Sequence, residues 1–100
     1  MMLYIDEHYN EQITLQDISR AGNVSQSLCN QIFNRFTEKS PVEYLLHYRS
    51  RKVADLLQAG NMSMSEIAEI TGFSGASYMA EIFKKFYKMS PRDFRKSTKK

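Results

Sequence analysis

The sequence repeats one pattern twice, at a separation of 49 or 50 residues. At a separation of 49, the matching pairs are Ile18 with Ile67, Asn23 with Gly72, Val24 with Phe73 and Ser25 with Ser74. At a separation of 50, they are Ser27 with Ser77, Leu28 with Tyr78, Ile32 with Ile82, Phe33 with Phe83, Phe36 with Phe86, Ser40 with Ser90 and Pro41 with Pro91. Because a solenoid usually needs three or more repeats, two copies favour a fold built from two similar small motifs.

Helical signals run through both copies. No segment alternates polar and apolar residues with a period of two, whereas helical periodicity and helix caps recur from end to end, so we expect an all-α fold. In the first copy, Thr14 and Asp17 resemble a capping pair, and Gly22 and Asn23 tolerate the left-handed backbone that commonly ends a helix. Ser25 then caps a longer helix that extends to about residue 38.

The second copy contains the same signals in the same order. Ser63 and Glu66 form a capping box, and Gly72 ends the short helix before a longer one. A short helix, a tight turn and a longer helix make up a helix-turn-helix motif. We expect one domain of residues 1–100, with a helix-turn-helix at about 14–39, a linker helix at about 41–59, a second helix-turn-helix at about 63–89 and a terminal helix at about 91–97.

The predicted linker helix has strong boundary signals. Ser40 and Glu43 form a capping box around Pro41, and Gly60 stops the helix after about 18 residues. At 1.5 Å per residue this helix is about 27 Å long, somewhat less than the ~34 Å between successive major-groove faces of DNA. If both motifs dock on one duplex, we expect the DNA to bend toward the protein.

The longer helix of each copy is amphipathic. At about 100° per residue, its apolar side chains gather on one side and its polar ones on the other. The residues predicted to face inward are Leu28, Cys29, Ile32, Phe33 and Phe36, and in the second copy Tyr78, Met79, Ile82, Phe83 and Phe86. Those predicted to face outward are Ser27, Asn30, Gln31, Asn34 and Arg35, and in the second copy Ser77, Ala80, Glu81, Lys84 and Lys85. Solvation would explain one such helix, but the duplication favours a functional face.

The outward faces have the chemistry of DNA recognition. Asn and Gln side chains can make bidentate hydrogen bonds to adenine, Glu can accept from the cytosine amino group, and Ala can touch a thymine methyl group. Gly75 and Ala76, at the start of the second helix, would allow close approach. The candidates for phosphate binding are Arg35, Lys39, Arg49, Arg51, Lys84, Lys85 and Arg95.

The charge is concentrated in the second half of the chain. Residues 1–50 carry 4 basic and 6 acidic side chains, whereas residues 51–100 carry 10 and 5, giving −2 and +5 and the net charge of +3. This asymmetry favours an anionic partner for the second half, although a solvated basic end would also explain it. Apolar residues make up 42% of the chain, enough for a globular core.

The sequence argues against an enzyme, a metal centre and a membrane protein. Cys29, His8 and His47 lack the spacing of a nucleophile or of metal ligands, so we expect no catalytic residue, metal or cofactor. A single cysteine suits a reducing cytoplasm. No apolar run approaches the ~20 residues that span a bilayer, and the first residues lack the layout of a signal peptide.

The stretch SEIAEITGFSGASYMAEIFKKFYKMSPRDFR resembles the second helix-turn-helix of the AraC/XylS family of bacterial transcription regulators, and the resemblance extends over nearly the whole chain. It implies a seven-helix DNA-binding domain, located in the bacterial cytoplasm and on the nucleoid when bound. The base-contacting residues that it implies are Ser27, Asn30, Gln31, Ala76, Ser77, Ala80 and Glu81. It also implies promoter DNA as the partner, a sensor or receiver domain in the same polypeptide and, for an activator, RNA polymerase.

Three residues depart from the family pattern. Glu81 stands where a basic or polar residue is common, Met79 replaces Phe, and Lys88 stands where a Gly is expected near the end of the helix. The alternative function is a helical adaptor that binds another protein through an apolar groove. An adaptor would expose an apolar patch and depend little on salt, whereas a DNA-binding domain would lose affinity steeply as salt rises.

Overall fold

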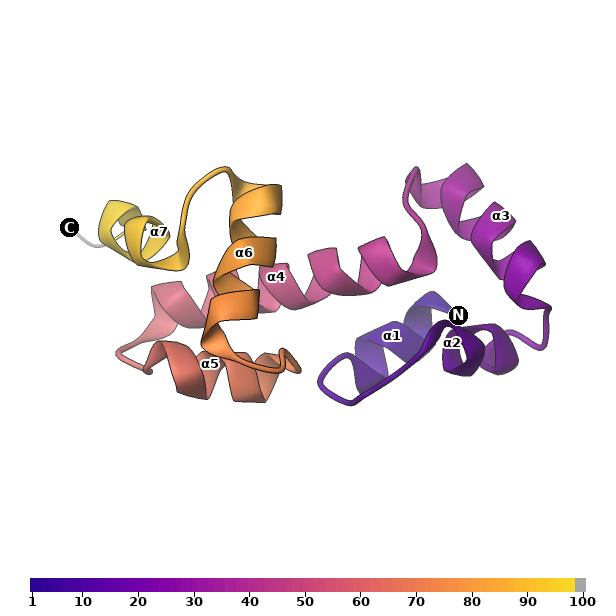
Figure 1. Cartoon of the computed structure of the whole chain (residues 1–100), viewed down its shortest axis with the longest axis horizontal. Helices are drawn as coiled ribbons and strands as arrows, with labels where there is room; N and C mark the ends of the chain where they lie inside the picture. Colours follow the sequence, from indigo (N-terminus) through magenta and orange to yellow (C-terminus); the bar gives the residue numbers. More distant parts are fainter. Residues whose placement is uncertain (99–100) are drawn as a thin grey trace. The chain divides into compact units, whose positions relative to one another are not determined.

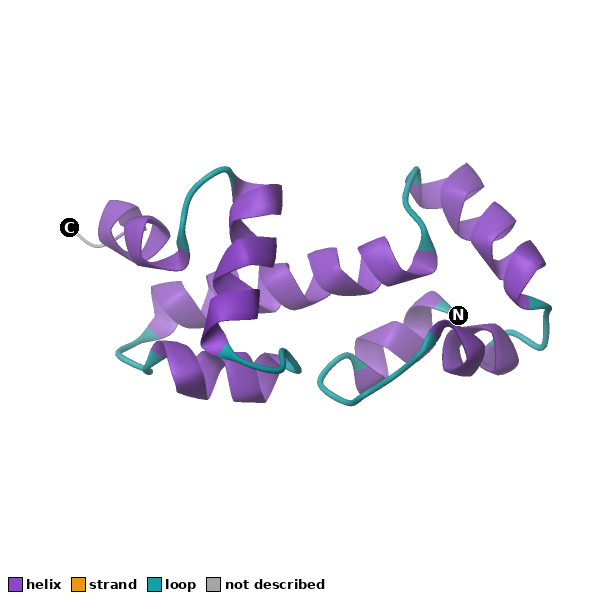
Figure 2. Ribbon diagram, viewed as in Figure 1, coloured by secondary structure: helices purple, strands orange, loops and turns teal. Residues whose placement is uncertain are grey.

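The computed structural model describes residues 1–98, and this part of the chain folds into helices without a strand (Figures 1 and 2). The all-α prediction is therefore confirmed. The helices are α1 (Met2–His8), α2 (Leu15–Ala21), α3 (Gln26–Thr37), α4 (Pro41–Ala59), α5 (Met64–Thr71), α6 (Ala76–Tyr87) and α7 (Pro91–Thr98).

The chain packs as two compact units, and the boundary between them falls within α4. The first unit is Met1–Tyr48, and its core takes one or two side chains from each of its helices. The fully or nearly buried side chains of that core are Ile5, Ile18, Cys29, Phe33 and Leu45. The ring of Phe33 meets that of Tyr44 edge-on, with 5.4 Å between the ring centroids. This packing joins α3 to the beginning of α4.

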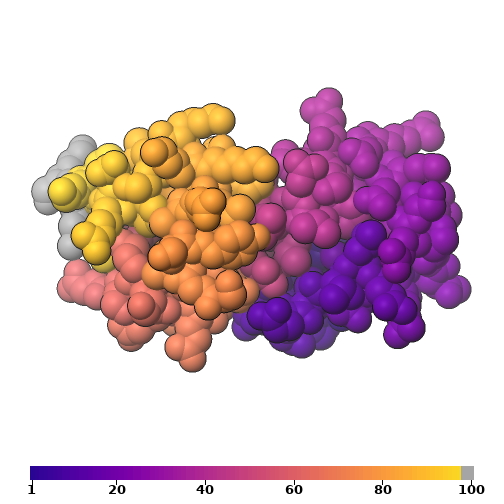
Figure 3. Space-filling model, in the orientation of Figure 1, coloured from indigo at the N-terminus to yellow at the C-terminus, as the bar shows by residue number. Residues whose placement is uncertain are grey.

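The second unit begins at Arg49 and has a core of its own. Its buried apolar residues are Val53, Ala54 and Leu57 from α4, Ile67 and Ala68 from α5, Phe73 from the turn, and Met79 and Phe83 from α6. Phe83 stacks on Tyr87 with ring centroids 4.4 Å apart, and both rings meet Phe94 of α7 edge-on. In the space-filling view, the atoms of α5, α6 and α7 adjoin one another without a gap, from salmon to yellow (Figure 3).

Side-chain caps fix where the helices begin. Thr14 with Asp17 and Ser63 with Glu66 form reciprocal capping boxes at the starts of α2 and α5. In the second box the backbone N–H of Ser63 donates to Glu66, and this hydrogen bond lowers the pKa of the Glu66 carboxyl. Ser40 and Glu43 exchange the same pair of hydrogen bonds, at 3.1 and 3.2 Å. The predicted helix starts therefore have the predicted chemistry.

The turns inside the two motifs use different residues. In the first turn, Asn23 has a φ of 55° while Gly22 has a φ of −93°, so Asn23 alone adopts the left-handed backbone. In the second turn Gly72 does so, with a φ of 90°. Asn23 and Gly72 are one of the pairs related by 49 residues. The two turns therefore have the same geometry although only one uses glycine.

Three of the side chains predicted to face inward are more exposed than expected. Leu28 is 43% exposed, Tyr78 is 40% exposed and Phe36 is 72% exposed. Leu28 and Tyr78 occupy equivalent positions, about 120° around the helix from the centre of the buried stripe. Phe36 points in a better direction but lies in the last turn of α3, beyond the buried residues of the first core. The prediction that Leu28, Tyr78 and Phe36 face the core is therefore wrong.

Helices α3 and α6, the longer helices of the two motifs, are each followed by a non-glycine residue with a left-handed backbone. Glu38 has a φ of 60° after α3, and Lys88 has a φ of 65° after α6. A residue with a Cβ atom adopts this conformation at a cost of about 1–2 kcal/mol. The Lys88 that departs from the family pattern therefore sits at a position suited to glycine.

Lys88→Gly is expected to stabilise the protein. Glycine removes the steric cost of the left-handed backbone, but it also makes the unfolded chain more flexible, which opposes folding. We expect a net increase of about 0.5–1 kcal/mol in the free energy of unfolding. Urea denaturation followed by circular dichroism measures the change. Lys84→Gly, inside α6, is the matched control and should destabilise by about 1 kcal/mol. Equal effects of the two substitutions would contradict the strain at Lys88.

Candidate nucleic-acid interface

The candidate reading face of the first unit, meaning the polar side of the helix that would contact DNA bases, lies on α3. Ser25 caps this helix by accepting a hydrogen bond from the backbone N–H of Leu28, at 3.1 Å. On the opposite side, Cys29 and Phe33 are fully buried, and burial raises the pKa of the Cys29 thiol. The side chains turned away from this core are exposed except for the half-buried Asn30, and they are Ser27, Asn30, Gln31, Asn34 and Arg35.

Two of the amides on this face already bond to their own helix. Asn30 Nδ2 donates to the carbonyl oxygen of Gln26 at 3.2 Å, and Asn34 Nδ2 donates to that of Asn30 at 2.8 Å. Because the amide nitrogen has two hydrogens, Asn30 could keep this bond, but the bond holds the amide against its own helix, whereas a bidentate contact with adenine needs the amide turned toward the base. Gln31 is exposed and one methylene longer. Gln31 is therefore the better placed of the two amides for reading a base.

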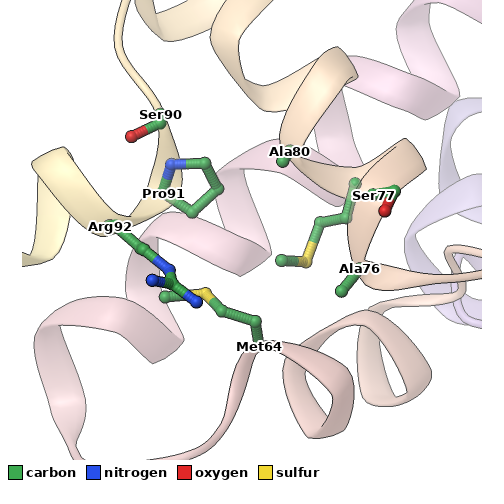
Figure 4. A pocket seen from close by; sticks show the side chains of 8 residues that line it. Met64, Ala76, Ser77, Ala80, Ser90, Pro91 and Arg92 are labelled. Atoms are coloured by element: carbon green, nitrogen blue, oxygen red, sulfur yellow. The ribbon is translucent and has the colours of Figure 1, made fainter.

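The candidate reading face of the second unit lies on α6 and consists of smaller side chains. Ser77, Glu81, Lys84 and Lys85 are exposed, whereas Ala76 and Ala80 are partly buried. Gly75 precedes the helix with extended backbone, and a Cβ atom added there would meet nothing within 4 Å. Ala76, Ser77 and Ala80 line an open hollow of about 240 Å³, together with Met64 of α5 and residues at the start of α7 (Figure 4).

The seven candidates for phosphate binding separate into two groups. Arg35, Arg51, Lys84 and Lys85 are exposed, and Lys39 is half-buried. Arg49, in contrast, is only 8% exposed, and its burial lowers the pKa of the guanidinium, an effect that the nearby Tyr78 opposes. Arg95 is partly buried and donates from Nη2 to the carbonyl oxygen of Met62 at 2.6 Å. Arg49 and Arg95 are therefore engaged within the fold of the second unit.

Sequence reasoning passed over one cation at the α6 face. Arg92, in the first turn of α7, is exposed and lines the same hollow as Ser77 and Ala80. In the sequence it is 12 residues from Ala80, so no helical periodicity connects the two. The capping pair of Ser90 and Asp93, which places Arg92 in the first turn of a helix, is the one local signal.

Comparison with known proteins identifies the family of this fold. A family model described as a helix-turn-helix domain matches residues 18–97. An uncharacterised helix-turn-helix transcriptional regulator, YdeC of Bacillus subtilis, is 36% identical over 96 residues, which cover 96% of this chain and 33% of YdeC. The C-terminal domain of the two-component response regulator YesN of Fusobacterium nucleatum has 30% identity and a TM-score of 0.86, with 94% of this chain and 92% of that one covered.

The fold is also that of a domain solved on DNA. The DNA-binding domain of the transcriptional factor AdpA, in complex with a target DNA, superposes with a TM-score of 0.90 at 22% identity, covering 96% of this chain and 86% of that one. The family match and the two helix-turn-helix motifs together make this chain a DNA-binding domain of a transcription regulator rather than an enzyme. The chain belongs to the AraC/XylS family.

The chain spans about a third of the length of the curated relatives it matches. Within residues 1–98, no helix is long and apolar enough to cross a membrane, and no cluster of His, Cys, Asp or Glu side chains could hold a metal ion.

Gln31→Ala is expected to weaken binding to the preferred DNA site more than Asn30→Ala does. The loss of a bidentate amide contact costs about 1–3 kcal/mol, and the intrahelical bond of Asn30 offsets part of that amount. Fluorescence anisotropy on a selected duplex and on one with the contacted base pair exchanged measures both affinity and base preference. Asn34→Ala is the control, one turn further along α3. A larger loss for Asn30→Ala would contradict the assignment of Gln31.

Proposed function

We propose that α3 and α6 enter successive major grooves on one face of a single duplex, at the promoter of a regulated gene. Support comes from the burial of Cys29 and Phe33 in one unit and of Met79 and Phe83 in the other, since all four are fully buried. Each pair is separated by one helical turn, so each helix is held with its polar side turned outward. Helix α4 contains 19 residues, a length of about 28 Å.

The proposed roles of individual residues follow from their position and chemistry. Base reading is assigned to Ser27, Asn30, Gln31, Ala76, Ser77, Ala80 and Glu81. Phosphate binding is assigned to Arg35, Lys39, Arg51, Lys84 and Lys85. Arg49 and Arg95, two of the original candidates, are omitted because the fold of the second unit already uses them. The observation that carries the proposal is the exposed polar face repeated on α3 and α6.

The remaining partners belong to the whole regulator. Relatives described as response regulators support a receiver domain in the same polypeptide, and a sensor domain is the other form. An activator of this kind would work in the bacterial cytoplasm, on the nucleoid, and would contact RNA polymerase beside the promoter. The helical adaptor considered earlier is not retained, because the family is one of DNA-binding domains.

Affinity for DNA is expected to fall steeply with salt. If about five phosphates are neutralised, the slope of log K against log salt is about −4.5, a loss of several hundredfold between 50 and 200 mM. Anisotropy titrations on a duplex obtained by selection from random sequences measure it. Lys84→Ala should weaken binding to all sequences alike and flatten the slope by about 1, while Lys96→Ala, on α7, serves as the control. A wild-type slope near zero would refute DNA binding as the function.

Binding is expected to bend the duplex toward the protein. Because α4 is about 28 Å long and successive grooves face one side every ~34 Å, docking of both helices brings the two sites closer together. Such a bend costs on the order of 1–6 kcal/mol, offset by the contacts of the second helix. Energy transfer between dyes at the two ends of the duplex measures the bend. A duplex with the second half of the site scrambled is the control, and an unbent intact site would contradict the proposal.

A further inference from the structure

The hollow in front of α6 contains a cation that the proposed function does not use. Arg92 extends from the first turn of α7 toward Met64, and Ala76, Ser77 and Ala80 of α6 line the other side of the hollow (Figure 4). Its side chain is exposed. Unlike Arg49 and Arg95, Arg92 makes no hydrogen bond or ion pair with the part of the chain that the structure describes. It is therefore available to an external anion at the edge of the reading face.

The small side chains of α6 explain why this edge is open. Ala76 and Ala80 carry only a methyl group each, so the space between the start of α6 and the start of α7 stays unfilled, with a volume of about 240 Å³. The lining is mainly apolar, and Arg92 is its one charged member. An apolar hollow beside a guanidinium suits a DNA backbone, which presents sugar carbons next to charged phosphate oxygens.

The hollow that Arg92 lines runs along α6 from Ala76 to Ala80, and Lys84 follows these two residues on the same ridge. Ala76, Ala80 and Lys84 are four residues apart and so lie on the same side of the helix. Lys84 lies eight residues beyond Ala76 and four beyond Ala80, or about 12 Å and about 6 Å along the axis. The length of the whole ridge, from Ala76 to Lys84, is close to the ~12 Å width of the major groove. A ridge of that length lying across the groove brings its two ends near the backbones of opposite strands.

We propose that Arg92 is a DNA-contacting residue of the second unit, and that it neutralises a phosphate on the strand opposite the one that Lys84 contacts. The inference rests on the proposed insertion of α6 into a major groove. Helix α7 thereby becomes part of the interface. Lys84 of α6 and Arg92 of α7 would contact phosphates on the two opposite strands that border the groove. The register of α6 in the groove is then fixed at both ends.

A salt titration gives the first test. One phosphate contact contributes about 0.9 to the slope of log K against log salt, so the advantage of the wild-type protein over Arg92→Gln should shrink about threefold to fourfold between 50 and 200 mM salt. Lys96→Gln, an exposed cation one turn further along α7, is the matched control and should keep the wild-type slope. Arg92→Lys should also keep the slope because it retains the charge. Circular dichroism checks that each variant is folded.

A methylphosphonate scan gives the second test, since it neutralises one phosphate of the selected duplex at a time. For the wild-type protein, at least one position on each strand beside the second groove should lose affinity about threefold or more. Arg92→Gln should abolish the loss at one position, and Lys84→Gln should abolish the loss at a position on the other strand. If the positions affected by Arg92→Gln and by Lys84→Gln lie on the same strand, the assignment of Arg92 is overturned.

The two proposals fail in distinguishable ways. If the wild-type protein shows no salt-dependent binding to any selected duplex, the proposed function fails. If it binds with a steep slope but Arg92→Gln behaves as Lys96→Gln does in both tests, the proposed function stands and the role of Arg92 is refuted. A flattened slope together with an abolished methylphosphonate effect supports Arg92 as a phosphate contact.

Discussion

The rotation of α3 and α6 about their own axes is the constraint on which the candidate interface depends. In each helix two fully buried side chains, four residues apart, hold that rotation: Cys29 with Phe33, and Met79 with Phe83. Turning either helix by one residue, about 100°, would bring polar side chains into the core and remove the large apolar ones from it. The polar face is therefore outward because of what is buried opposite it, and the repeat preserves this relation 50 residues later.

Local signals in the sequence predicted most of the fold, because the helix starts and turns are local events. Ser63 with Glu66 caps a helix through contacts within four residues, so the sequence contains all the necessary information. Whether Arg49, Arg95 and Phe36 are buried or exposed depends instead on tertiary packing. Periodicity cannot show that Arg95 donates a hydrogen bond to Met62, 33 residues away in the sequence. It also cannot show that the first core does not extend as far as Phe36. Arg92 was missed for the same reason, since α7 lies beside α6 only in the folded unit.

The two motif helices divide affinity and specificity unequally under the proposed function. Residues 1–48 carry 3 basic and 6 acidic side chains, whereas residues 49–100 carry 11 and 5. The counterion release that drives salt-dependent binding would therefore come mainly from the second unit. The first unit offers amides on α3, whose bidentate hydrogen bonds discriminate between bases by about 1–3 kcal/mol each. The first unit would then contribute more to base reading, and the second more to holding the duplex.

This division of affinity and specificity suggests a role for Glu81 in discriminating between DNA sites. An exposed carboxylate on a reading face is repelled by phosphates on both sides of the groove, so it lowers affinity for every sequence. Where it accepts a hydrogen bond from a cytosine amino group it recovers that loss, and elsewhere it does not. The cations Lys84, on the α6 ridge, and Arg92, beside the hollow, would supply the attraction that keeps the second helix bound despite this acid. Glu81 would thus discriminate by penalising wrong sites, which only a helix held by charges at both ends can tolerate.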